Sequence, residues 1–157
     1  MSAAEVADAV VGAIESGSYP LIVVNFANGD MVGHTAVADA VIRAVETLDR
    51  EAGRVLDAAV ANDYSVVLTA DHGNREELLD PATDMPQTQH TAYPVPCLVV
   101  DSLTWQLSNA GGLANVAPTV LDLMGLPKPE GMTARSLLLR PVREVVRPIP
   151  DLSRAVA

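Results

Sequence analysis

Two short apolar runs separated by one long amphipathic stretch constrain the fold more than any other feature of the sequence. The runs, residues 21–26 and 65–70, are rich in β-branched side chains, which is typical of strands buried on both faces. Between them, apolar residues recur at helical spacing from residue 37 to residue 61, and Thr35 precedes this stretch as a candidate cap. The order strand, helix, strand predicts an α/β fold with parallel strands and a right-handed crossover.

Further elements are expected on both sides of this unit. We predict a first helix over residues 3–16, with Ser2 as its cap, and a polar loop over residues 27–34. Downstream, we expect a third strand over residues 97–101 and a helix over residues 113–124.

The domain organisation follows from length and composition. The chain has 157 residues, of which 49% are hydrophobic and 19% charged, so it fits one globular domain. From residue 141 onward it is rich in Arg and Pro. We therefore predict one domain over residues 1–140, followed by a loosely attached tail over residues 141–157.

Charge and cysteine content narrow the classes of partner and compartment. The net charge of −10 argues against nucleic acid or an anionic membrane as the main partner. No apolar run approaches the roughly 20 residues of a membrane helix, and residues 1–11 lack the basic start of a secretory signal. The single cysteine, Cys97, excludes an internal disulfide framework, so a cytoplasmic location is the simplest expectation.

The three histidines of the chain mark a candidate metal site. His34 follows Asp30 by four residues, and His72 directly follows Asp71 at the end of a predicted strand. His90 lies in a long polar segment. Mixed carboxylate and imidazole ligands suit Mn, Co, Fe or Zn, and the carboxyl ends of parallel strands are where open α/β sheets bind ligands.

The same residues also have ordinary interpretations. A histidine in a surface loop is often only solvated, and Asp71 could cap the turn that follows its strand. Asn74 and Glu76 could be ordinary polar residues of a loop. The pattern alone leaves both interpretations open.

Other kinds of catalytic site leave no trace in the sequence. There is no phosphate-binding P-loop and no dinucleotide fingerprint, and none of the serines lies in a Gly-x-Ser-x-Gly elbow. Cys97 opens an apolar strand and is expected in the core rather than as a nucleophile. We therefore assign no catalytic residue and no organic cofactor site to this chain.

Three ordered motifs resemble one enzyme family. Residues 25–35 (NFANGDMVGHT), residues 69–74 (TADHGN) and His90-Thr91 followed by residues 94–96 (PVP) are similar to signatures of the cofactor-independent, or 2,3-bisphosphoglycerate-independent, phosphoglycerate mutases. The resemblance covers about residues 1–138. Small departures affect turn shape: they include Gly29 in place of a usual Pro, and also Ala36, Ala134 and Tyr93.

This resemblance implies a fold, an activity and a set of ligands. It implies an alkaline-phosphatase-like, three-layered α/β fold with a mostly parallel sheet, of which this chain supplies a part. It also implies a glycolytic isomerase that interconverts 3- and 2-phosphoglycerate through a phosphoserine and uses two Mn²⁺ ions. Carried over residue by residue, one ion would be held by Asp30, His34 and His90, and the other by Asp71 and His72.

The resemblance also identifies what this chain lacks. In the family, the nucleophilic serine and further ligands of the second metal come from an earlier stretch, so the match is to the C-terminal, metal-binding part. Phosphoglycerate is the expected substrate once the site is completed, and the expected partner is an upstream polypeptide half or a second copy of this chain. The alternatives are a non-catalytic metal-binding fragment or subunit, and a phosphatase or phosphonate-handling relative.

Overall fold

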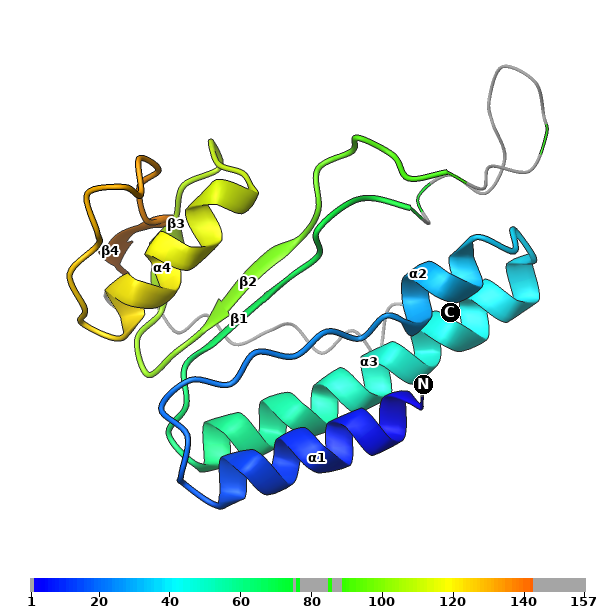
Figure 1. The fold of residues 1–157 in the computed structure, drawn as a ribbon, viewed down its shortest axis with the longest axis horizontal. Coiled ribbons are helices and arrows are strands. Elements are labelled where there is room, and N and C mark those ends of the chain that lie inside the picture. The colour runs from blue at the N-terminus through cyan, green and yellow to red at the C-terminus, as the bar shows by residue number, and fades with distance from the viewer. Residues whose placement is uncertain (1, 75, 77–84, 86–88, 143–157) are drawn as a thin grey trace, which may run out of the picture.

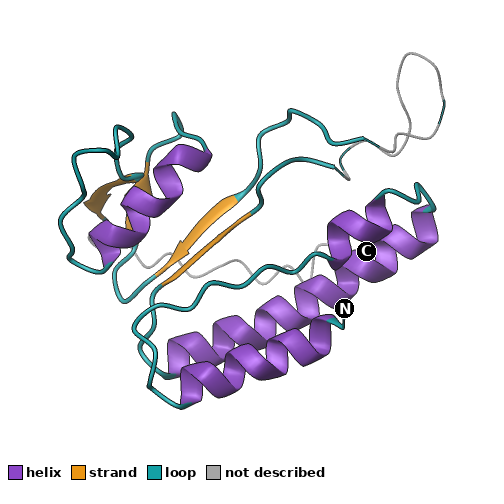
Figure 2. Ribbon diagram, in the orientation of Figure 1, coloured by secondary structure: helices purple, strands orange, loops and turns teal. Residues whose placement is uncertain are grey.

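The structure is a computed structural model, and it describes residues 2–74, 76, 85 and 89–142. The helices and strands are shown in Figures 1 and 2. In chain order they are α1 (Ala3–Glu15), α2 (Asn28–Gly33), α3 (Ala38–Ala61), β1 (Val66–Thr69), β2 (Cys97–Val100), β3 (Trp105–Leu107), the 3-10 turn η1 (Leu113–Asn115), α4 (Val116–Leu123) and β4 (Leu138–Pro141).

Helices α1 and α3 lie side by side and form the main core (Figure 1). Their facing side chains are small or branched and pack tightly: Ala7, Val10, Ile14, Val55 and Ala59. The predicted first helix is confirmed, because Ser2 caps it by accepting a hydrogen bond from the Glu5 backbone N–H at 3.5 Å. An ion pair between Arg54 and Asp8, 2.6 Å apart, joins the two helices at the surface.

The predicted strand over residues 21–26 is wrong as a hydrogen-bonded strand. This segment is extended and runs in the same direction as β1, but it is not part of a strand ladder (Figure 1). Ile22 and Phe26 pack against the α1–α3 core. The segment therefore takes the extended course expected of an apolar, β-branched run, but no neighbouring strand pairs with its backbone groups among the described residues.

The described strands pair in an antiparallel manner. β1 pairs with β2 in the register Val66 opposite Val100 to Thr69 opposite Cys97, which confirms the predicted strands over 65–70 and 97–101. The second ladder, between β3 and β4, is also antiparallel and was not expected from the sequence. A mostly parallel sheet is thus not formed by the described strands themselves. The segment 21–26 runs parallel to β1, but it forms no ladder with β1.

A short helix replaces the polar loop predicted over residues 27–34. Residues 28–33 form α2, which packs against α3. Thr35 does not cap the long helix: its hydroxyl donates to the Val32 carbonyl at 2.6 Å, and α3 starts after Val37. The reason is the backbone of Ala36, whose φ of 51° is left-handed and separates the two helices.

The C-terminal part forms a small unit around α4. The helix predicted over residues 113–124 is confirmed as η1 followed by α4, which ends at Leu123, just before Gly125 with its φ of 65°. Thr119 is fully buried, donates to the Asn115 carbonyl at 2.7 Å and accepts from the Leu137 N–H at 2.9 Å. Most of the predicted tail, residues 143–157, lies outside the described residues, so the proposed domain boundary at residue 140 stays a prediction.

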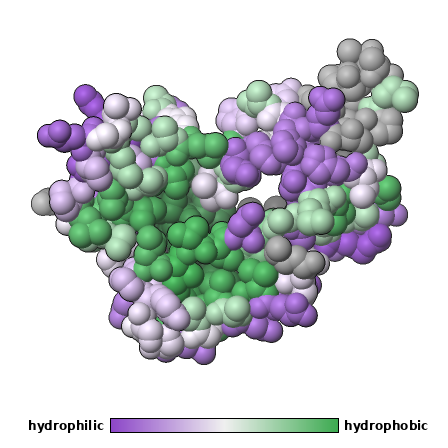
Figure 3. Space-filling view, in the orientation of Figure 1, coloured by the Kyte–Doolittle hydropathy of each residue, from purple (hydrophilic) through white to green (hydrophobic). Residues whose placement is uncertain are grey.

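Large apolar side chains of the segment 21–26 and of β2 are exposed. Leu21, Val23 and Leu98 have exposed fractions of 51%, 86% and 50%. Figure 3 shows hydrophobic residues gathered where the β1–β2 pair, the segment 21–26 and α4 meet, and hydrophilic residues around the loops beyond β1. None of the helices among the described residues combines the length and the apolar character needed to cross a membrane.

Candidate metal centre

Helix α2 presents two of the predicted ligands on one face. Asp30 lies in its first turn and His34 is the residue that ends it, so their side chains are four residues apart and meet on the helix surface. The Nε2 atom of His34 is 3.3 Å from Oδ1 of Asp30. The helical spacing therefore brings this carboxylate and this imidazole together on one face of α2.

The third ligand comes from the loop before β2. Nε2 of His90 is 3.1 Å from Oδ1 of Asp30 and 3.3 Å from Nε2 of His34. A bridge between Gly73 and Thr91 holds this loop, with the Thr91 N–H donating to the Gly73 carbonyl at 2.9 Å. Asp30, His34 and His90 thus form one cluster whose ligand atoms all lie within 4.8 Å of one another.

The spacing of these three atoms fits a divalent ion. Ligand bonds of about 2.0–2.1 Å place neighbouring ligand atoms about 3.0 Å apart in octahedral geometry and about 3.4 Å apart in tetrahedral geometry. The three separations of 3.1, 3.3 and 3.3 Å lie in this interval. Because a carboxylate oxygen and imidazole nitrogens converge here, a shared positive charge would stabilise the arrangement, and this donor set suits Mn, Co, Fe or Zn.

The cluster is open to solvent on one side. The side chains of Asp30, His34 and His90 are 37%, 43% and 47% exposed. Partial burial raises the pKa of Asp30, but the hydrogen bond from Asn74 and the neighbouring histidines lower it, and the net direction is downward. Asp30 therefore stays ionised, as a metal ligand must, while the open side leaves room for a further ligand.

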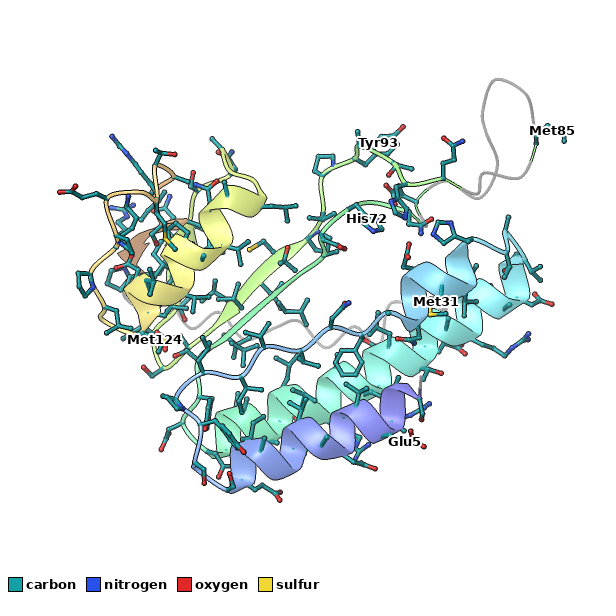
Figure 4. All side chains as sticks on the ribbon, viewed as in Figure 1. Glu5, Met31, His72, Met85, Tyr93 and Met124 are labelled. Carbon is teal, nitrogen blue, oxygen red and sulfur yellow. The ribbon has the colours of Figure 1, made fainter. Side chains whose placement is uncertain are left out.

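The second predicted pair, Asp71 and His72, lies beside this cluster but is not a complete site. Figure 4 shows His72 at the end of the β1–β2 pair that faces α2. Its ring stacks on that of His90 with centroids 3.6 Å apart, and its Nε2 atom is 3.9 Å from Oδ1 of Asp30 and 3.6 Å from Oδ1 of Asp71. Among the described residues, the two contribute to no group of three or more candidate ligands.

A cleft opens from this pair toward α4. It has a volume of about 440 Å³. Its lining combines Asp71, His72 and Tyr93 with the apolar side chains of Leu113 and Val116. A ligand or a chain segment in this cleft would therefore reach the second candidate pair directly.

Three polar residues around the cluster, Asn74, Glu76 and Thr91, were not assigned a role from the sequence. Asn74 donates from Nδ2 to Oδ1 of Asp30 at 2.7 Å. Glu76 accepts from the backbone N–H of Asn74 at 2.9 Å and from the hydroxyl of Thr91. Their proximity to Asp71, His72 and His90 in the sequence was the available signal, but loop polar residues are too common for that signal to be decisive.

Comparison with known proteins places this geometry in a family context. The sequence model of the metalloenzyme superfamily matches residues 1–128. A 2,3-bisphosphoglycerate-independent phosphoglycerate mutase of Cellvibrio japonicus is 51% identical over 138 residues, which cover 88% of this chain and 27% of that protein. The enzyme of the same name from Rhodopirellula baltica is also 51% identical, over 140 residues, covering 88% of this chain and 26% of that protein. The chain thus spans about a quarter of the length of these relatives.

A solved structure is also similar. A crystal structure of Leishmania mexicana phosphoglycerate mutase, determined at low cobalt concentration, superposes with a TM-score of 0.78 at 33% sequence identity. The match covers 88% of this chain and 28% of that one. Together with the family match, this likeness supports the alkaline-phosphatase-like α/β fold, present here as a partial domain.

Proposed function

The chain belongs to the metalloenzyme superfamily, and from that premise we propose that it provides the metal-binding part of a cofactor-independent phosphoglycerate mutase. The observation that carries the proposal is the cluster of Asp30, His34 and His90, whose three ligand atoms have the mutual spacing of a metal coordination sphere. Relatives named as such mutases are 45–51% identical over most of this chain, which supports this activity over a phosphatase.

The protein groups at the site have distinct tasks in this proposal. Asp30 supplies a negative charge, and its lowered pKa keeps that charge in place at neutral pH. His34 and His90 offer imidazole nitrogen donors from two different segments, and the exposed side of the cluster leaves a position for a substrate oxygen. A divalent ion, when bound, would activate an oxygen nucleophile and neutralise phosphoryl charge.

The identity and number of the ions belong to this proposal as well. We favour Mn²⁺, with a second ion held in part by Asp71 and His72. The closeness of His72 to Asp30 supports adjacent ions, and the exposed carboxylate of Asp71 is accessible to one. This second ion needs ligands that the described residues do not provide.

A complete mutase needs components from outside this chain. The family resemblance assigns the nucleophilic serine and the missing ligands to an earlier stretch, and the relatives are about four times longer than their match to this chain. The exposed apolar side chains of Leu21, Val23 and Leu98 support association with an upstream polypeptide half or with another copy of this chain. A cytoplasmic location and phosphoglycerate as substrate complete the proposal.

Complementation tests this function. The purified chain is mixed with the segment of the Cellvibrio japonicus relative that it does not match, in the presence of Mn²⁺, and conversion of 3- to 2-phosphoglycerate is followed. Turnover is expected from the mixture, and a mixture containing His34→Ala is the matched control. Light scattering of each component and of the mixture shows whether a complex forms.

The other outcomes separate the alternatives. Release of free phosphate from model esters without mutase turnover would indicate a phosphatase. Metal binding without turnover of either kind would indicate a non-catalytic metal-binding module, and either result would overturn the proposed mutase function.

A further inference from the structure

Asn74 joins the loop after β1 to the helix that carries Asp30. It is only 7% exposed, and its side-chain nitrogen is 2.7 Å from Oδ1 of Asp30. Because an ionised carboxylate only accepts hydrogen bonds, the amide nitrogen rather than the oxygen must face Asp30. A carboxylate oxygen has two lone pairs, so one can receive this hydrogen while the other remains for a metal ion.

Asn74 is itself held by Glu76. One carboxylate oxygen of Glu76 accepts from the backbone N–H of Asn74 at 2.9 Å, and the other accepts from the hydroxyl of Thr91. Thr91 follows His90 directly, and its own N–H donates to the Gly73 carbonyl at 2.9 Å. Glu76 therefore connects the loop that carries Asn74 with the loop that carries His90.

The two polar atoms of the Asn74 side chain differ in their contacts. Oδ1 of Asn74 is buried and has no hydrogen-bond partner among the described residues. Among the described residues, the hydrogen bond that holds this side chain is therefore the one from Nδ2 to Asp30. Asn28 provides a comparison: its Oδ1 is also buried and unpartnered within the described residues, but its Nδ2 donates to the Ala44 carbonyl at 3.4 Å.

We infer that Asn74 is a positioning residue for the metal site: it fixes the Asp30 carboxylate, and Glu76 holds Asn74 and the His90 loop in register. The inference rests on the proposed metal site at Asp30, His34 and His90. Without the hydrogen bond from Asn74, the carboxylate would be free to rotate about its Cβ–Cγ bond. The three ligand atoms would then have to be ordered at the moment the ion binds, which weakens binding.

Cobalt titration of the full chain tests this role. The visible absorption of bound Co²⁺ reports the geometry of the ligands, which a residue with a merely structural role would not change. We expect Asn74→Ala to lower Co²⁺ affinity by about 10- to 100-fold and to alter the spectrum. Asn74→Gln, which keeps an amide donor, should recover part of both.

Two controls frame the measurement. Asn28→Ala removes a partly buried amide that does not bind Asp30, and it should keep Co²⁺ affinity within about threefold of the unchanged chain. His34→Ala removes a ligand and should abolish the spectrum. Circular dichroism without metal shows whether each variant is folded. If Asn74→Ala does not fold, Glu76→Ala takes its place, with an expected loss of about tenfold in affinity.

The outcomes are distinguishable. If the unchanged chain binds no Co²⁺, the proposed metal site fails, and this inference fails with it. If the unchanged chain binds Co²⁺ and a folded Asn74→Ala or Glu76→Ala variant shows the same affinity and spectrum, the metal site stands and the positioning role of Asn74 is overturned.

Discussion

The two candidate ligand groups of this chain differ in how many segments build them. Asp30, His34 and His90 come from α2 and from a loop 56 residues later, and their ligand atoms converge to within 4.8 Å. Asp71 and His72 are consecutive residues of one loop, and the side chain of Asp71 is 81% exposed. A coordination sphere needs atoms from several directions, which a dipeptide cannot supply by itself.

The elements that carry the two groups also differ in how much of this chain supports them. Helix α2 packs along α3, so Asp30 and His34 are carried by a supported helix. Asp71 and His72 lie just beyond the last paired residues of the β1–β2 ladder, Thr69 and Cys97. The first group is thus largely organised within this chain, whereas the second depends on what binds next to it.

The largest expected effect concerns catalysis by the isolated chain. Because the described residues give Asp71 and His72 no further ligand, and the sequence patterns assign no nucleophile to this chain, we expect no conversion of 3- to 2-phosphoglycerate by the purified chain with Mn²⁺ alone. An assay coupled to consumption of 2-phosphoglycerate would detect it. Robust turnover would show that Asp71 and His72 need no ligands from outside this chain. It would contradict the proposed difference between the two ligand groups.

The next effect separates the groups by metal affinity. We expect one Mn²⁺ or Zn²⁺ to bind tightly and a second weakly, with His34→Ala lowering the affinity of the tight site by more than about 100-fold. Asp71→Ala should leave that site within about threefold, because Asp71 contributes none of its three ligands. Isothermal titration after dialysis against a chelator measures the metal affinity of both variants. Equal losses in the two variants would contradict the assignment.

A third effect is the stabilisation of the fold by metal. A ligand at 100 times its Kd stabilises the folded state by about 2.7 kcal/mol, which for a chain of this size raises the Tm by roughly 5–10 °C. Differential scanning calorimetry with Zn²⁺ should show this shift in the unchanged chain and in Asp71→Ala. The shift should disappear in His90→Ala and on addition of a chelator. If His90→Ala kept the shift, the tight site would lie elsewhere.

The smallest effect concerns the strand pair that supports Asp71. The Ser65 hydroxyl, 2.5 Å from Asp101, holds the pKa of that carboxyl below its usual range. Partial burial opposes this, and the Trp105 indole N–H, 2.7 Å away, reinforces it. A lowered folded-state pKa gives a contribution to stability that is fully present above the unfolded pKa of about 3.9 and is lost as the pH falls through the folded value.

Asp101→Asn should therefore lower the free energy of unfolding by about 1 kcal/mol at pH 7, and the difference should vanish at a pH below the lowered folded-state pKa of Asp101. Chemical denaturation at the two pH values measures it. The affinity of the tight metal site should not change, because α2 does not depend on these hydrogen bonds. A loss of metal affinity in Asp101→Asn would show that the two groups are coupled through the strands.

Local pattern determined most of the individual elements of this protein. The cap at Ser2, the helical periodicity of α1 and α3, and the β-branched runs at β1 and β2 are visible in the sequence, because they depend on neighbours a few residues away. The contact between Asp30 and His34 was also visible in the sequence, because a spacing of four residues brings two side chains together on one face of a helix. All five predicted metal ligands were named from motifs, although the structure gathers only three of them into one cluster.

Tertiary structure decided the features that depend on distant partners. Residues 21–26 have the composition of a buried strand, but a strand exists only when another pairs with it, and in this chain the segment packs on helices instead. A polar loop was predicted over residues 27–34, but these residues form α2, and the left-handed Ala36 separates α2 from α3. The roles of Asn74 and Glu76 depend on contacts with Asp30, 44 residues away, and with Thr91, 15 residues away. A hydrogen bond across such a separation leaves no periodicity in the sequence, so only the folded chain shows which loop polar groups support the site.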